Sequence, residues 1–101
     1  MIRVMCDLET LGINSNAPIL AIGAVAFDDE TGAVGDSFYR CVDPETSVER
    51  GAVRDVSTVM WWLKQGDAAR ASVTKKEGAT HITAALRDFA DWYPSPKVQF
   101  W

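Results

Sequence analysis

The chain has 101 residues, which is enough for one small domain with a single hydrophobic core and too few for two domains. Its composition, 48% hydrophobic and 24% charged residues, is that of an ordinary globular protein. The net charge of -4 argues against a polybasic protein that coats nucleic acid. It leaves room for a nucleic-acid enzyme whose carboxylates are neutralised by metal ions.

The N-terminal residues show no signal-peptide pattern. The longest apolar run, residues 17–27, contains Pro18 and Gly23 and is too short to cross a bilayer. Cys6 and Cys41 lie on different expected strands without a C-x-x-C spacing, which disfavours a disulfide framework and a zinc site. We therefore expect a cytoplasmic protein without membrane contact, in which both thiols are reduced and buried.

Three strands are expected in the first half of the chain. Residues 2–9 form the first strand, and residues 10–17 form a polar loop. Residues 19–27 are almost continuously apolar, which predicts a strand buried on both faces near the centre of a sheet. Residues 36–42 alternate well enough to be a third strand, and the turn residues before them predict a hairpin. Short connections favour an antiparallel meander.

The hydrophobic period changes to a helical one after the third strand. Residues 45–55 are expected to form a charged loop. A helix follows over residues 58–65, with Ser57 as its N-cap and Gly66 as its stop signal.

Two further helices and one strand are expected in the last third of the chain. Asp67 is the expected cap of a short helix over residues 68–73, and Thr80 is the expected cap of the last helix. Residues 98–101 have the pattern of a fourth strand that is just starting. The last helix carries an apolar stripe that consists of Ile82, Ala85, Leu86, Phe89 and Tyr93.

Two carboxylates interrupt the first strand. Asp7 and Glu9 are two positions apart, so their side chains project from the same face of the strand. Two acids within an otherwise apolar strand are costly unless a cation compensates them, and carboxylate oxygens are the ligands that Mg²⁺ and Mn²⁺ prefer. A bare D-x-E pattern is equally typical of a strand end whose acids are solvated. Cys6, next to Asp7, points to the opposite face and is expected to pack in the core.

The surrounding sequence resembles a known superfamily. The run Asp7-Leu8-Glu9-Thr10 after an apolar strand resembles the first motif of the DEDD (DnaQ-like) 3′–5′ exonucleases. Residues 18–25 are similar to the second strand of that group, and residues 58–63 resemble a helix of its phage and prophage exonuclease VIII-type branch. The resemblance implies an α/β, ribonuclease H-like mixed sheet with packed helices, present in part. Residues 1–101 would be the N-terminal portion of a single exonuclease domain, truncated before the later acidic motifs.

The resemblance also implies a metal-dependent chemistry. Four acidic residues of the superfamily hold two divalent metals, and Asp7 and Glu9 match the first two of these residues. Asp7 would bridge two Mg²⁺ or Mn²⁺ ions, and Glu9 would hold the ion that carries the nucleophile. The later acids and the general base have no counterpart here. We therefore expect this chain by itself to show little or no turnover.

The implied substrate is the 3′ end of a single-stranded nucleic acid, with DNA and RNA both left open. Thr10 and Leu11 resemble loop residues of the superfamily that touch the terminal nucleotide, although a turn Thr and a core Leu would give the same pattern. Trp61 and Trp62 lie about 100° apart on a helix, so both cannot face one core. Trp62 shares the apolar helix face and is expected in the core, which leaves Trp61 to line the substrate groove.

The remaining polar residues are interpreted without a catalytic role. His81 is expected to be a surface or capping residue, and Lys75 and Lys76 a solvated loop pair. The apolar residues 98–101 would favour pairing with a second copy, which would give a homo-oligomer. The sequence predicts a metal-dependent 3′–5′ exonuclease. The alternatives are an inactive exonuclease-fold remnant that acts as a binding or interaction module, and a structural domain whose D-x-E is coincidental.

Overall fold

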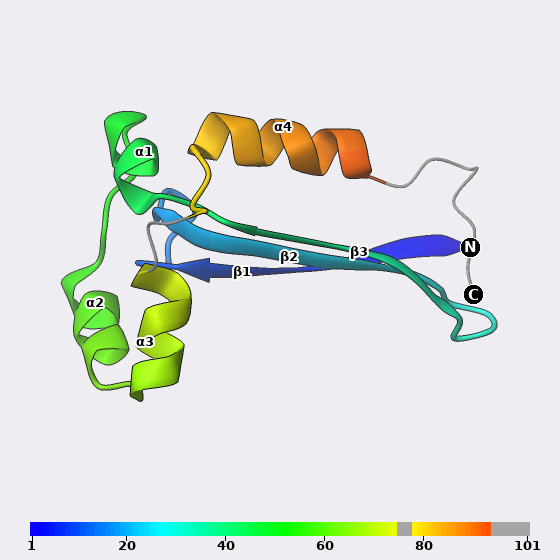
Figure 1. Ribbon diagram of the computed structural model, residues 1–101, viewed down its shortest axis with the longest axis horizontal. Helices are drawn as coiled ribbons and strands as arrows, with labels where there is room; N and C mark the ends of the chain where they lie inside the picture. The colour runs from blue at the N-terminus through cyan, green and yellow to red at the C-terminus, as the bar shows by residue number, and fades with distance from the viewer. Residues whose placement is uncertain (75–77, 94–101) are drawn as a thin grey trace.

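A three-stranded antiparallel sheet forms the centre of the protein. The computed structural model describes residues 1–74 and 78–93. Strands β1 (Ile2–Thr10), β2 (Ile19–Asp28) and β3 (Val34–Cys41) pair in the order β1-β2-β3 (Figure 1). The predicted meander is confirmed. The expected fourth strand, residues 98–101, lies outside the described residues.

The described residues form four helices beside the sheet. They are α1 (Pro44–Glu49), α2 (Val56–Leu63), α3 (Asp67–Thr74) and α4 (Ile82–Trp92). Helix α4 lies along one side of the sheet, and α2 and α3 lie on the other side, near the end of the sheet where β1 finishes (Figure 1). The architecture is an α/β fold compatible with a partial ribonuclease H-like exonuclease domain, as expected from the sequence.

Strand β2 is central because it has a partner on each edge and apolar residues on both faces. Its register pairs Ala24 with Cys6 of β1 and with Phe38 of β3. Leu20, Ala21 and Ile22 are almost fully buried although they alternate between the two faces. The burial of both faces predicted from the continuous apolar run is therefore confirmed.

The turn between β2 and β3 requires a glycine. Gly32 has a φ of 75°, in the left-handed region that favours glycine. Its amide donates to the carbonyl of Asp28 at 2.8 Å, and the Asp28 amide donates to the carbonyl of Ala33 at 2.9 Å. The carboxylate of Asp28 also accepts from the amide of Glu30 at 2.8 Å. These bonds close the hairpin and set the register of β3.

The hydrophobic core lies between the sheet and α4. The Phe38 ring packs edge-on against Phe89, with 5.5 Å between centroids, and lies 5.7 Å from Trp92. Ala85 is fully buried, which allows the helix backbone to approach the strands. The core cluster consists of Ile22, Ala24, Phe38, Val42, Ile82 and Ala85.

The apolar stripe predicted on α4 is wrong in two positions. Leu86 and Tyr93 are 49% and 56% exposed. The residues that face the sheet are Ile82, Ala85, Phe89 and Trp92, a spacing of i, i+3, i+7 and i+10. Tyr93 is the C-cap, where the backbone has left the helical conformation, so its side chain does not continue the stripe.

The prediction that both thiols are buried is also wrong. Cys6 is exposed and Cys41 is half-buried. Cys6 does lie on the face opposite to Asp7, together with Ala24 and Phe38. However, β1 is one of the two outer strands of the described sheet, and α4 contacts the other outer strand, β3, more than it contacts β1. Side chains of an outer strand remain exposed when no helix covers them.

The segment predicted as a charged loop over residues 45–55 contains a helix instead. Helix α1 begins directly after Asp43, whose carboxylate accepts from the amide of Glu45 at 3.1 Å. Pro44 occupies the first helical turn, where its missing N–H costs nothing. The Asp-Pro pair therefore starts this helix and does not simply end the hairpin.

Two predicted N-caps are wrong by one or two residues. Asp55, not Ser57, caps α2, because its carboxylate accepts from both the amide and the hydroxyl of Ser57, at 2.9 and 2.7 Å. His81, not Thr80, caps α4 by accepting from the Thr83 amide at 3.1 Å. The capping role expected for His81 is confirmed. Helix α3 spans the predicted segment to within one residue at each end.

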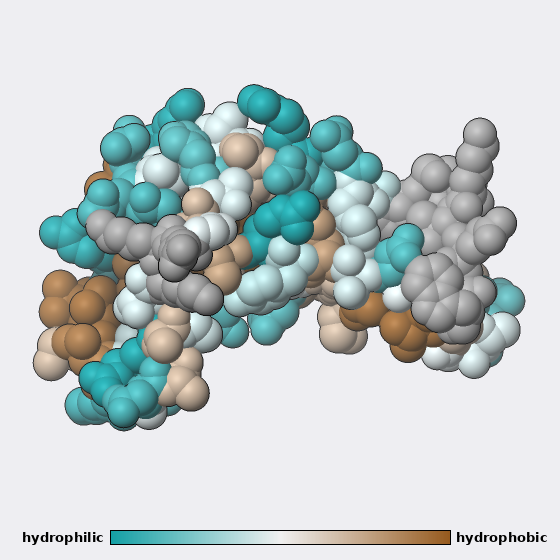
Figure 2. All heavy atoms as spheres, in the orientation of Figure 1, coloured by the Kyte–Doolittle hydropathy of each residue, from teal (hydrophilic) through white to brown (hydrophobic). Residues whose placement is uncertain are grey.

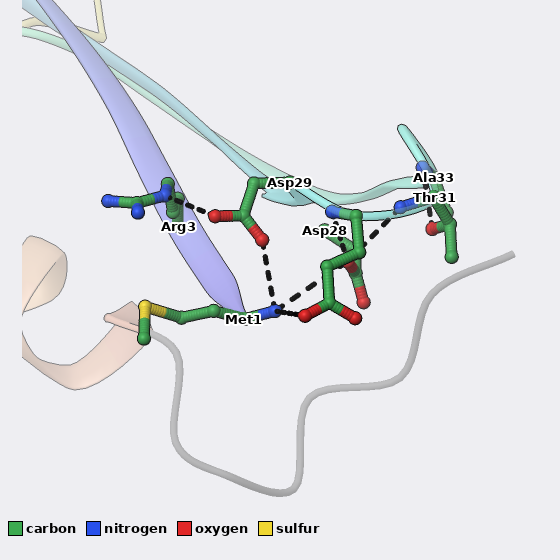
Figure 3. Close-up of polar contacts among 7 residues, drawn as sticks. Met1, Arg3, Asp28, Asp29, Thr31 and Ala33 are labelled. Carbon is green, nitrogen blue, oxygen red and sulfur yellow. Dashed lines mark hydrogen bonds and ion pairs between the residues drawn. The ribbon is translucent and has the colours of Figure 1, made fainter.

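A polar cluster joins the start of β1 to the turn after β2. The Met1 ammonium group and the Arg3 guanidinium lie 3.0 and 2.6 Å from the two carboxylate oxygens of Asp29 (Figure 3). The hydrogen bond from Arg3, followed by that from the Met1 ammonium, lowers the pKa of Asp29 below its ordinary value. The cluster is solvent-exposed, so it fixes the strand end without forming part of the core.

The surface is hydrophobic at the end of the molecule where α2 lies (Figure 2). Val56, Met60 and Leu63 of this helix are each at least half exposed. No helix in residues 1–74 or 78–93 is long and apolar enough to cross a membrane.

Replacing Phe38 with Ala should destabilise the protein strongly. Loss of a buried aromatic ring costs about 3–5 kcal/mol, because the transfer free energy is lost and a cavity remains. Urea unfolding followed by circular dichroism would measure the change. Leu86→Ala, on the exposed side of α4, should change the free energy of unfolding by less than about 0.5 kcal/mol. Equal effects of the two substitutions would contradict the assigned core.

The Asp29 cluster predicts a pH dependence. Because the folded-state pKa of Asp29 is lowered, its stabilising contribution is present above the ordinary value of 3.8 and is lost as pH falls through the folded-state pKa. In a carboxyl-carbon NMR titration, Arg3→Ala should move the Asp29 midpoint upward toward 3.8. Asp55 is the internal control, because its lowered pKa depends on Ser57 and not on Arg3. If the Asp29 midpoint is the same in the unmodified protein and in Arg3→Ala, the ion pair is refuted.

Candidate active site

Asp7 and Glu9 project from the face of the sheet opposite to α4. The register places Asp7 beside Gly23 and Glu9 beside Ala21, while the core residue Phe38 belongs to the alternate set of positions. Both carboxylates are exposed. Their neighbours on β2 have no side chain larger than a methyl group. The two acids are therefore accessible to a bound ion or substrate, although Ala21 beside Glu9 is almost fully buried.

The sheet register shifts directly after the acids. The pairing with β2 is irregular between Glu9 and Thr10, and such irregularities re-aim side chains at the end of a strand. The Thr10 hydroxyl donates to the carbonyl of Gly12 at 2.5 Å. The Leu11 amide donates to the carbonyl of Pro18 at 3.0 Å. These bonds hold the chain in a fixed turn beyond Glu9.

Helix α2 is fixed against this turn by two hydrogen bonds from distant residues. The indole Nε1 of Trp62 donates to the carbonyl of Thr10 at 2.9 Å. The amide of Asp55, the N-cap of α2, donates to the carbonyl of Leu11 at 2.8 Å. Consecutive carbonyls at the end of β1 thus accept from the two ends of the helix segment, which sets its position relative to Glu9.

An open groove of about 430 Å³ lies between the end of β1 and α2. Trp61 is 53% exposed and stands on one side of the groove. Its ring packs edge-to-face against that of Trp62, at an angle of 81° and with 5.0 Å between centroids. The groove is lined by Leu8, Glu9, Thr10, Gly12, Ile13, Ser57, Thr58, Trp61 and Trp62.

The structure brings most of the sequence-predicted site residues together. Glu9, Thr10 and Trp61 line the groove, and Asp7 lies two residues before Glu9 on the same face. Leu11 lies elsewhere, in a separate apolar cavity of about 300 Å³ that it lines with Val59 and other residues. Trp62 is half-buried and borders both spaces, so it is not part of the central core.

Some of the residues that line the groove were not predicted from the sequence. Gly12 and Ile13 belong to the loop after the D-x-E-T motif, and Ser57 and Thr58 belong to the first turn of α2. The polar character of the loop gave no sign that it borders a groove. An N-cap at Asp55 would have placed Ser57 and Thr58 in the first turn of the helix.

The electrostatics at the start of α2 have a clear cause. Hydrogen bonds from the Ser57 hydroxyl, then from the Ser57 amide, lower the pKa of Asp55. The carboxylate is therefore ionised at neutral pH, in the form that accepts both hydrogen bonds of the cap.

The donor set at Asp7 and Glu9 suits a hard divalent cation. Carboxylate oxygens are preferred by Mg²⁺ and Mn²⁺, and Mg²⁺ is commonly held by one or two carboxylates while it keeps several waters. Exposure of both side chains leaves space for those waters. Within the described residues, no group of three or more His, Cys, Asp or Glu side chains is arranged to hold a metal ion.

Comparison with known families identifies the chain. The sequence profile of the family described as the 3'-5' exoribonuclease Rv2179c-like domain matches residues 2–101. The protein belongs to this family. No curated protein and no solved structure gave a significant match.

Membership supports the 3′–5′ exonuclease family inferred from the D-x-E-T motif. The match spans both the strand that carries Asp7 and Glu9 and the helix that carries Trp61. The family description names an exoribonuclease, whereas the sequence analysis left DNA and RNA open. An exoribonuclease-like function is therefore indicated for this domain.

The bond between Trp62 and Thr10 can be tested by removing only the donor. Trp62→Phe keeps an aromatic ring but leaves the Thr10 carbonyl without its indole partner, so a loss of about 1 kcal/mol in unfolding free energy is expected. Urea unfolding would measure it. The matched control, Trp61→Phe, alters an exposed ring and should cost less than about 0.5 kcal/mol. A larger loss in the control would contradict the anchoring role of Trp62.

Proposed function

We propose that this domain acts as a metal-dependent 3′–5′ exoribonuclease of the DEDD type, which hydrolyses phosphodiester bonds at the 3′ end of single-stranded RNA. The observation that carries the proposal is the family match over residues 2–101, combined with the shared exposed face of Asp7 and Glu9 beside the groove. The D-x-E-T motif supports the DEDD type. The further likeness to the exonuclease VIII-type branch rests on residues 58–63.

Each proposed site residue has a distinct task. Asp7 and Glu9 would hold Mg²⁺ or Mn²⁺, which when bound supplies activation of water and neutralisation of charge on the phosphate. Thr10 would position the terminal nucleotide through the rigid turn that its hydroxyl closes. Trp61 would offer its exposed ring for base stacking, which is sequence-tolerant and worth about 1–3 kcal/mol per base. Leu11 would act indirectly, by packing beneath this turn.

A second candidate is a binding module without turnover. It is favoured by the finding that, among residues 1–74 and 78–93, Asp7 and Glu9 are joined by no third metal-binding side chain in one group. Two carboxylates hold Mg²⁺ weakly, because this ion dehydrates reluctantly and demands octahedral geometry. On this account the chain would bind metal and RNA 3′ ends but release few nucleotides.

The test combines metal binding with RNA degradation. Calorimetric titration with Mn²⁺ measures the affinity of the site. We expect this affinity to fall at least about tenfold in the Asp7→Asn, Glu9→Gln double variant, because the ligand charge is removed while the side-chain shape is kept. The matched control is Asp36→Asn, an exposed acid on β3 beside the core residue Phe38, which should leave binding unchanged.

Incubation with 3′-labelled RNA and Mn²⁺ separates the two candidates. Release of mononucleotides that is lost in the double variant supports the exonuclease. Metal-dependent RNA binding without release supports the binding module. Absence of both metal and RNA binding in the unmodified chain would refute the proposed site.

A further inference from the structure

A tyrosine lies on the same face as the two carboxylates but on the far strand. The register aligns Asp7 of β1 with Gly23 of β2 and Tyr39 of β3. Residues paired in this way project to the same side of a sheet. Because Gly23 has no side chain, nothing from β2 stands between Asp7 and Tyr39. Two strand spacings, about 10 Å, separate their backbones, a span that a nucleoside can bridge.

The tyrosine ring leans over the glycine. A Cβ atom built at Gly23 would lie 3.7 Å from Cδ2 of Tyr39, an ordinary contact distance. The ring therefore covers Gly23 and does not extend away from β2. Its direction brings the aromatic surface toward the strand that carries Asp7 and Glu9.

The phenol is held in place at its hydroxyl end. The Cys41 sulfur lies 3.7 Å from the Tyr39 oxygen and also 3.7 Å from the carbonyl of Ser72 in α3. The pKa of Tyr39 is raised above its ordinary value of 10.0. The main cause is the hydrogen-bonding contact with Cys41, followed by burial and then by the charges of Cys41 and Glu9. The hydroxyl is thus protonated at neutral pH and lies within the electrostatic influence of Glu9.

Tyr39 nevertheless remains 57% exposed. Trp61, which lines the groove together with Glu9, is 53% exposed. One aromatic side chain in the register row of Asp7 and one in the groove beside Glu9 thus keep more than half of their surface exposed. Aromatic faces and phenolic hydroxyls are groups that bind bases and ribose hydroxyls.

We propose that Tyr39 is a substrate-binding residue that forms the β3 side of the nucleotide site, with its ring packed against the 3′-terminal ribonucleotide and its hydroxyl hydrogen-bonded to it. The inference rests on the proposed function, because Asp7 and Glu9 define where the terminal nucleotide lies. It adds a second aromatic wall to the one that Trp61 provides. It also gives Gly23 a role, since a larger residue would fill the space between Asp7 and Tyr39.

The chain contains two tyrosines, which allows a direct spectroscopic test. The protein labelled with 3-fluorotyrosine should give two fluorine NMR signals, assigned with a Tyr93→Phe variant. Titration with adenosine 5′-monophosphate and Mg²⁺ should shift the Tyr39 signal and leave that of Tyr93 unchanged, because Tyr93 lies at the end of α4. Nucleotide affinity should fall about fivefold or more in Tyr39→Ala and stay constant in Tyr93→Phe. The milder Tyr39→Phe tests the hydroxyl alone should Tyr39→Ala fail to fold.

The outcomes separate the two proposals. Nucleotide binding that depends on Asp7 but moves neither the Tyr39 signal nor the affinity of its variants overturns the role of Tyr39 and leaves the proposed function standing. Absence of nucleotide binding in the unmodified chain overturns both. A shift of the Tyr39 signal together with weaker binding by its variants supports the second aromatic wall.

Discussion

The hydrogen bond from the Trp62 indole to the Thr10 carbonyl is the contact on which the candidate site depends. It joins a residue at the end of β1 to one 52 positions later in the chain, at 2.9 Å. Together with the bond from the Asp55 amide to the Leu11 carbonyl, it fixes α2 beside the strand that carries the acids. The two bonds thereby set the position of Trp61 relative to Glu9 across the groove.

The sheet supplies the second constraint. Pairing with the rigid hairpin of β2 and β3 sets the register of β1, and the register alone decides that Asp7 and Glu9 face away from α4. The same alternation directs Phe38 into the core and Tyr39 onto the carboxylate face. One side of the sheet therefore packs against α4, and the other carries the exposed side chains of Asp7, Glu9 and Tyr39.

Periodicity and motif spacing predicted the strands, the meander and the shared face of Asp7 and Glu9, because these follow from local alternation. Features that depend on neighbours could not be read in this way. The exposure of Cys6 follows from the position of β1 at the outside of the described sheet, and the exposure of Leu86 follows from the exact line of contact between α4 and the strands. Tyr39 was part of a predicted strand, but its relation to Asp7 needed the register of all three strands.

The central claim is that the cation site lies at Asp7 and Glu9, and the acidic turn around Asp28, Asp29 and Glu30 is its strongest competitor within the described residues. Paramagnetic broadening by substoichiometric Mn²⁺ in a proton–nitrogen NMR spectrum distinguishes them directly. The account predicts that the amides of Asp7, Glu9 and neighbouring Gly23 broaden first, while those of the turn persist. Broadening centred on the turn, with the Asp7 and Glu9 signals unaffected, would contradict it.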